Sequence, residues 1–151
     1  MLKIELTKKV KANISQLGVN QISRAVVKVV KIRKKSEVSL ALVSNPEIKK
    51  INQIYRGQNK VTDVLSFAAN EEDFICPESQ NYLGEIIISY PQLVRQARQN
   101  KCSIKQEFSL LVVHGLLHLL GYDHEGNRKE KEKMRMLEEK ILSKFNYVKK
   151  N

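Results

Sequence analysis

All three histidines of the chain lie within one eleven-residue segment, at positions 114, 118 and 124. His114 and His118 are four residues apart, so on a helix they project from the same face about one turn apart. Gly121 can adopt a left-handed conformation that ends such a helix and turns the chain back, which allows His124 to supply a third nitrogen. Three imidazoles suit one divalent metal ion, zinc above all, and leave a fourth position for water or substrate. The spacing therefore predicts an open metal site on His114, His118 and His124.

A chance cluster of ordinary histidines is the simplest alternative, but the ligand spacing and the helix-ending glycine favour a metal site. A closed structural site would need a fourth ligand, such as Cys76 or Cys102, and the sequence places neither cysteine near the histidines. The two cysteines do not form a CxxC pair, so we expect free thiols in a reducing cytosol.

The same HxxxHxxGxxH spacing occurs in one class of zinc peptidase, in which a glutamate directly follows the first histidine as the general base. This chain has Gly115 at that position, so a peptidase would lack its base. Zinc by itself lowers the pKa of a bound water to near neutrality, which can suffice for a phosphodiester. The absent glutamate therefore favours a nucleic acid over a peptide as substrate.

The charge of the chain supports a polyanionic substrate. The net charge is +11, from 27 basic and 16 acidic residues. Residues 1–60 hold 14 basic and 3 acidic residues, whereas residues 61–151 hold 13 of each, so the whole excess lies in the first 60 residues. Lysine and arginine contacts to phosphates supply most sequence-independent affinity for nucleic acids. The alternative is compositional drift toward lysine, and the one-sided distribution favours nucleic-acid binding.

The elements that must position these residues follow from hydrophobic periodicity and capping signals. The predicted strands are 2–6, 38–43 and 82–89, and residues 61–67 form a short strand or an extended loop. The predicted helices are 14–35, 45–57 with Asn45 as N-cap, 91–97, 103–120 and 128–145. Residues 70–81 are acidic and polar and are expected to form an exposed loop.

The order β-α-β-α-β-β-α-α-α predicts an α/β (α+β) fold, with a small mixed sheet of about four strands packed with about five helices. No repeat or linker divides the chain, so residues 1–151 are expected to form a single domain. No segment is apolar for long enough to span a membrane. The first residues include Glu5 and several lysines where a signal peptide needs an apolar core, so we expect a cytoplasmic protein.

Four sequence blocks resemble the bacterial YbeY family, metal-dependent endoribonucleases that act as rRNA maturation factors. The blocks are His114-Gly-Leu-Leu-His118-Leu-Leu-Gly121-Tyr122-Asp123-His124, Tyr55-Arg56-Gly57, Thr62-Asp63-Val64-Leu65-Ser66-Phe67 and Leu83-Gly84-Glu85-Ile86. They occur in the order and spacing of the family and cover residues 50–124. The histidine block is highly specific, whereas the first 45 residues match only in length and general pattern.

The resemblance implies a single α/β domain that binds a zinc-type ion on the three histidines and hydrolyses single-stranded RNA. It further implies work on the 3′ end of 16S rRNA, a part in ribosome quality control, and RNA partners, namely the 16S rRNA precursor and the 30S or 70S ribosome. No DNA partner is expected. The functional arginine of the family falls on Arg56, whose guanidinium could clamp a phosphate in two places and stabilise developing charge as a catalytic group.

Other polar residues near these blocks have two interpretations each. Asp63 and Ser66 either line the same cleft or cap a turn. Asp123 either orients a histidine or shapes the turn after the helix. Glu85 stands where the family has aspartate and keeps the charge. Glu107 is expected to be a surface or capping carboxylate rather than a base.

The leading hypothesis is a single-strand-specific, metal-dependent endoribonuclease of ribosome maturation. One rival is a metallopeptidase-like hydrolase, which turnover of peptides without turnover of RNA would support. The other rival is a non-catalytic RNA-binding or ribosome-assembly protein whose metal only stabilises the fold. Unfolding upon chelation, without RNA cleavage by any preparation, would support that reading.

Overall fold

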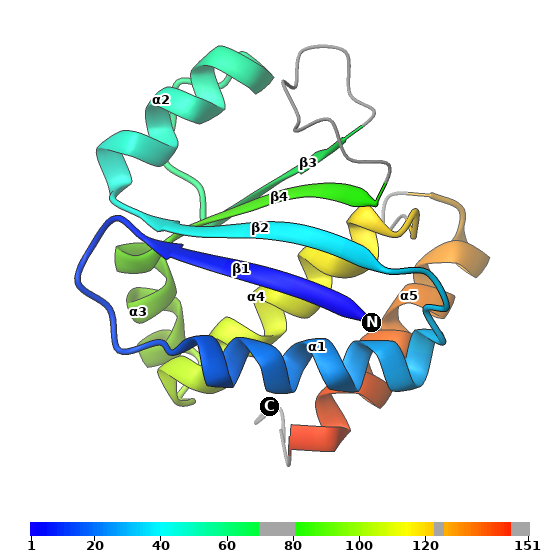
Figure 1. The fold of residues 1–151 in the computed structure, drawn as a ribbon. Coiled ribbons are helices and arrows are strands. Elements are labelled where there is room, and N and C mark those ends of the chain that lie inside the picture. Colours follow the sequence, from blue (N-terminus) through cyan, green and yellow to red (C-terminus); the bar gives the residue numbers. More distant parts are fainter. Residues whose placement is uncertain (70–80, 123–125, 146–151) are drawn as a thin grey trace.

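Four strands form one mixed sheet in the order β1-β2-β4-β3 (Figure 1). The strands are β1 (Leu2–Lys8), β2 (Ser36–Val43), β3 (Val64–Ala68) and β4 (Tyr82–Ser89). β1, β2 and β4 are parallel, and β3 is antiparallel to β4. The segment predicted as a strand or an extended loop is therefore an edge strand.

The computed structural model describes residues 1–69, 81–122 and 126–145. Nearly all of the predicted loop 70–81 lies outside the described residues, as do Cys76, Asp123 and His124.

Five α-helices follow the predicted order of elements. They are α1 (Gln16–Val30), α2 (Asn45–Arg56), α3 (Tyr90–Gln99), α4 (Ile104–Leu119) and α5 (Arg128–Leu142), and a short 3₁₀ helix, η1 (Ser143–Phe145), follows α5. Each α-helix has a serine or asparagine N-cap whose side chain accepts a hydrogen bond from a first-turn backbone N–H. These caps satisfy donors that a helix N-terminus otherwise leaves without a partner.

Two predicted helix boundaries were wrong. The N-cap of α2 is Ser44 rather than Asn45, and the Asn45 side-chain oxygen instead accepts a hydrogen bond of 2.6 Å from the Ser89 hydroxyl. The helix predicted over 14–35 ends at Val30, because Lys31 adopts a left-handed conformation (φ 58°) in which its N–H donates to the Val27 carbonyl.

The sheet carries a separate core on each face. On one face, α1, α3, α4 and α5 bury 23 residues against the strands. On the other face, α2 is the only helix in the part of the chain that the structure describes (Figure 1), and it covers a core of six buried residues: Ala41, Val43, Ile48, Leu65, Phe67 and Ile87. Residues 86–88 of β4 are buried on both faces, which explains their continuous isoleucine run. Among the described residues, no helix is both long enough and apolar enough to cross a bilayer.

Candidate active site

The central helix α4 carries His114 and His118. Nine of its sixteen residues are buried, and its first turn is fixed by a capping box between Ser103 and Gln106. His114 is partly buried and His118 is exposed, one turn further along the same helix. An apolar, well-anchored helix therefore holds both imidazoles on a rigid support, as a metal site requires.

The chain turns back directly after α4, as predicted from Gly121. Gly121 has a φ of 98°, and its N–H donates to the His118 carbonyl, while the Tyr122 N–H donates to the Leu117 carbonyl. These two bonds form a Schellman turn, which ends a helix at a left-handed residue. The Tyr122 ring then lies 5.7 Å from the Lys133 ammonium of α5. The chain thus leaves α4 in the direction of α5 just before His124.

Two of the three predicted ligands are therefore described, and the third, His124, is not. Within residues 1–69, 81–122 and 126–145, no group of three or more histidine, cysteine, aspartate or glutamate side chains is arranged around a common centre.

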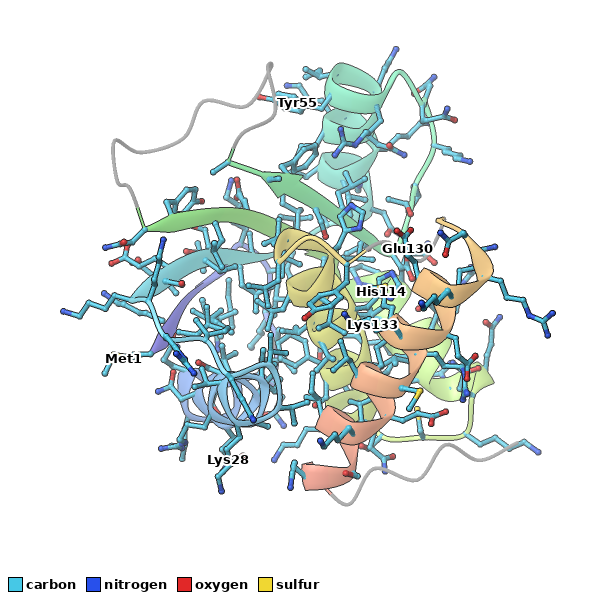
Figure 2. All side chains as sticks on the ribbon, turned by 90° about the vertical axis from the view of Figure 1, so that its right-hand side faces the viewer. Met1, Lys28, Tyr55, His114, Glu130 and Lys133 are labelled. Carbon is cyan, nitrogen blue, oxygen red and sulfur yellow. The ribbon has the colours of Figure 1, made fainter. Side chains whose placement is uncertain are left out.

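Glu138 of α5 holds the ring of His114. The Nδ1 atom of His114 lies 2.6 Å from Oε1 of Glu138 (Figure 2 shows His114 between α4 and α5). This hydrogen bond raises the pKa of His114, burial opposes the rise, and the charges of Glu138 and Asp63 add to it. Since Nδ1 faces the carboxylate, a metal ion would be coordinated by Nε2. A carboxylate behind a ligating histidine is a recurrent feature of metal sites, so the donor set fits a divalent ion.

The sequence reasoning missed Glu138, although the sequence held a signal for it. Met134, Glu138 and Ile141 are spaced by four and three residues, so they share one face of α5. Met134 and Ile141 are fully buried. A carboxylate on the core-facing side of a helix needs a partner, because burial of an isolated charge is costly.

Gly115 lies where α4 approaches the sheet most closely. A Cβ atom at this position would lie 3.0 Å from Cδ1 of Ile86 and 3.2 Å from the Ser66 hydroxyl oxygen. The glutamate of the peptidase motif would therefore need the side chains of Ile86 and Ser66 to shift. The absence of the peptidase base thus has a steric reason.

Arg56, the last residue of α2, is held against β3. Its Nη2 donates a hydrogen bond of 2.8 Å to the Ser66 carbonyl, and its guanidinium carbon lies 4.6 Å from the centre of the Phe67 ring. The Tyr55 ring meets the same Phe67 edge-on, with ring centres 5.3 Å apart. Since the Ser66 side chain faces Gly115, the structure places Arg56 and the histidines on neighbouring elements joined through Ser66.

Asp63 both caps a turn and acts on His114. Its carboxylate accepts hydrogen bonds from the Val64 N–H at 2.8 Å and from the Gln96 amide at 3.2 Å, which fixes the start of β3. Its charge also helps to raise the pKa of His114. Asp63 therefore has a local structural role at the start of β3 and also lies near enough to His114 to act on its charge.

Glu107 was expected to be a surface or a capping carboxylate, and the first of these alternatives is wrong because Glu107 is buried. It is 3% exposed and accepts hydrogen bonds from the Asn100 amide and from the Cys102 thiol at 3.2 and 3.5 Å. Burial, followed by the bond to Glu107 and its charge, raises the pKa of Cys102, so this cysteine is a free, protonated thiol. The predicted free thiol is confirmed for Cys102, and the carboxylate closes the turn between α3 and α4.

Glu85 faces away from α4. It pairs with Phe67 across β3 and β4, and side chains alternate along a strand, so it lies on the opposite side of the sheet from Ile86. Burial raises the pKa of Glu85, and the charge of Lys9 opposes the rise. Its place is in the α2 face rather than beside the histidines.

Comparisons with known proteins identify a family. The family model described as Endoribonuclease YbeY matches residues 3–146. The Endoribonuclease YbeY of Syntrophomonas wolfei is 45% identical over 128 residues, covering 82% of this chain and 81% of that protein. That of Halalkalibacterium halodurans is 46% identical over 115 residues, with 72% of each chain covered. The solution structure of TM1509 from Thermotoga maritima is 30% identical, with a TM-score of 0.62, covering 97% of this chain and 92% of that one.

Proposed function

The chain belongs to the family described as Endoribonuclease YbeY, and on this premise we propose that it is a metal-dependent endoribonuclease specific for single-stranded RNA. Membership supports an RNA-cleaving hydrolase. We further propose that its substrate is the 16S rRNA precursor on the 30S or 70S ribosome, that it acts in 3′-end maturation and quality control, and that it works in the cytoplasm.

The observation that carries the proposal is the His114–Glu138 pair on α4 and α5, next to the strand that holds Arg56. A divalent ion, zinc by its preference for imidazole, would be held by His114, His118 and His124 and would supply Lewis-acid polarisation of a phosphodiester. Glu138 would keep the His114 ring in the orientation that coordination needs.

Arg56 would stabilise the phosphate that is cut. Hydrolysis of a phosphodiester builds negative charge on the oxygens around phosphorus, and a guanidinium that is already oriented can stabilise that charge without reorganisation. The Ser66 carbonyl and the Phe67 ring provide that orientation. A planar guanidinium also matches two phosphate oxygens at once. Arg56 is therefore proposed as a catalytic residue.

Cleavage of a labelled 16S rRNA 3′-end precursor by His114→Ala and Arg56→Ala tests this site. His114→Ala should abolish cleavage, and Arg56→Ala should reduce it by about a hundredfold or more. Arg98→Ala is the matched control, because Arg98 is also an exposed arginine in the last turn of a helix, α3. Cleavage by both site variants at the wild-type rate, with their folds intact by circular dichroism, would show that the active site lies elsewhere.

Chelation separates the endoribonuclease from its rivals. The buried residues of α4 pack against the sheet through apolar side chains, so we expect metal removal to abolish cleavage and to leave the fold intact. Unfolding on chelation, together with a failure of every preparation to cut RNA, would favour the metal-stabilised RNA-binding protein. Turnover of a peptide library in place of RNA would favour the peptidase.

A further inference from the structure

A basic cluster lies at the C-terminal end of α1 and in the turn that follows it. Its six members, all exposed, are Arg24, Lys28, Lys31, Arg33, Lys34 and Lys35, and residues 24–36 contain no acidic side chain. In the described part of the chain, none of the six side chains takes part in an ion pair or a hydrogen bond. Lys9, by contrast, pairs with Glu47 at 3.0 Å.

Two members of the cluster, Arg24 and Lys28, line an open groove of about 830 Å³. They are four residues apart and so lie on the same face of α1, and Lys31 follows as the C-cap of the helix. Lys144 of η1 contributes a further cation to the lining of the groove. Cations from two distant segments thus converge on one surface.

Lys31 occupies a backbone conformation that disfavours a lysine. Its φ of 58° lies in the left-handed region, where glycine is the usual residue after a helix. Among the described residues that are not glycine, only Lys31 and Lys101 have a positive φ. Lys101 carries the same strain, so the strain does not itself assign a function to Lys31, but glycine at either position should relieve it.

The helix dipole explains the position of only some of these cations. Cations in the last turn of a helix interact favourably with the helix C-terminus, which covers Lys28 and Lys31. The effect fades within one turn, so it covers neither Arg24 nor the three cations that follow the helix.

We propose that this basic cluster is a binding surface for the phosphate backbone of RNA that flanks the cleaved strand. The inference rests on the proposed function, since it extends the RNA beyond the bond that is cut. In Figure 1 the C-terminal ends of α1 and α4 lie at the same end of the molecule, and Figure 2 looks onto that end, with Lys28 at the lower left and His114 near the centre. RNA that leaves the histidines can therefore continue toward the cluster.

RNA fits this surface better than a membrane does. A membrane-binding amphipathic helix needs an apolar face that can enter the lipid. The apolar face of α1 is already buried in the core, through Val19, Ile22 and Val26. The groove is lined by apolar residues as well as by Arg24, Lys28 and Lys144, and the exposed cations around it are what suits a phosphate backbone.

Neutralising three of the lysines tests the surface. We expect Lys28→Gln/Lys34→Gln/Lys35→Gln to bind a long single-stranded RNA about tenfold more weakly, with a salt-dependence slope shallower by about two, since each phosphate contact on a single strand contributes about 0.7 to that slope. Cleavage of a short oligonucleotide confined to the histidine site should not change.

The matched control is Lys129→Gln/Lys131→Gln/Lys140→Gln. It removes the same charge from exposed positions of α5, where glutamates are interleaved with the lysines. It should leave long-RNA affinity almost unchanged. Equal weakening by both triple variants would show that only net charge matters, and would overturn the proposed surface.

Lys31 gives a second test that a loss of stability cannot imitate. Lys31→Gly relieves the left-handed strain, so it should raise the melting temperature while weakening binding of long RNA. Lys101→Gly relieves the same strain and removes the same charge between α3 and α4, and it should stabilise the protein without affecting RNA. Unchanged RNA binding by Lys31→Gly would show that Lys31 does not contribute to the RNA-binding surface.

The outcomes separate this surface from the proposed function. If wild-type protein cuts neither long nor short RNA, the proposed function fails. If it cuts both and the Lys28/Lys34/Lys35 variant cuts and binds both as the wild type does, only the surface fails. Binding to phosphatidylserine vesicles that the triple variant loses, without any change in RNA binding, would assign the cluster to a membrane and refute the proposal.

Discussion

Replacement of Glu138 should weaken zinc binding by about tenfold in Glu138→Gln and about a hundredfold in Glu138→Ala. The carboxylate lies 2.6 Å from Nδ1 of His114, and the His114 and Glu138 side chains are only 34% and 19% exposed. A short, charge-assisted hydrogen bond in such a partly buried place contributes roughly 1.5–3 kcal/mol. Since tenfold in affinity is about 1.4 kcal/mol, this range spans about one to two decades of affinity. Glutamine keeps an acceptor oxygen for Nδ1–H and loses only the charge, so it should fall at the lower end.

The assay is competition for zinc with a chromogenic chelator at about pH 8, above the ordinary pKa of histidine. This pH matters because Glu138 has two opposing effects. It orients the ligand, but it also raises the pKa of His114 and so strengthens competition by protons. The second effect fades as pH rises, so the same competition is repeated at higher pH until the change in affinity becomes constant, and that constant change reports coordination alone.

Glu139→Gln is the control for this experiment. Glu139 is the neighbouring carboxylate and pairs with Arg135 at 2.6 Å on the exposed side of α5. It should bind zinc as the wild type does. Zinc affinities of Glu138→Gln and Glu138→Ala within about twofold of the wild type would refute the role of Glu138, because the expected loss is at least several times larger.

Three further outcomes follow from the structure. In metal-free protein the folded-state pKa of His114 lies above its unfolded value, so its contribution to stability is complete below about pH 6 and is lost as pH rises through the folded pKa. The melting temperature should therefore depend less steeply on pH in Glu138→Gln than in the wild type. An equally steep dependence in both proteins would contradict the assignment. Gly115→Ala should destabilise the fold by roughly 1 kcal/mol, because crowding against Ile86 outweighs the better helix propensity of alanine; urea unfolding measures it, and a stabilised variant would disprove the close approach. Gly18→Ala should instead stabilise by about 0.5–1 kcal/mol, since a Cβ there would meet its nearest neighbour at an ordinary 3.5 Å; destabilisation in the same urea experiment would contradict it.

Most of the fold could be predicted from periodicity and caps, because the apolar pattern of each element has one dominant period. The errors lie where two neighbouring residues are equally suited to a role. Ser44 and Asn45 are both good N-caps, and only the tertiary bond from Ser89 to Asn45 decides between them. The early end of α1 at Val30 could not be read from sequence, since Ile32 continues the apolar spacing and a left-handed lysine is rare.

The candidate site could be predicted only within its local segment. His114 and His118 follow from helical spacing, whereas Glu138 is 24 residues further on and reaches His114 only through the packing of α5 against α4. The position of Arg56 at Ser66 likewise depends on how α2 lies over the sheet. Glu107 was misjudged because burial of a carboxylate depends on partners, here Asn100 and Cys102, that lie in the preceding turn.

The cores on the two faces of the sheet differ in size, so the parts of the site that lie on each face should open at different free energies. α2 rests on six buried residues, whereas the helices of the other face share 23. Regions with little buried apolar contact open at lower free energy than the molecule as a whole. Amides of α2 should therefore exchange with solvent by sub-global opening, while those of α4 exchange only on global unfolding. Arg56 would then detach and re-dock many times during the life of one folded molecule, with the histidines staying in place throughout.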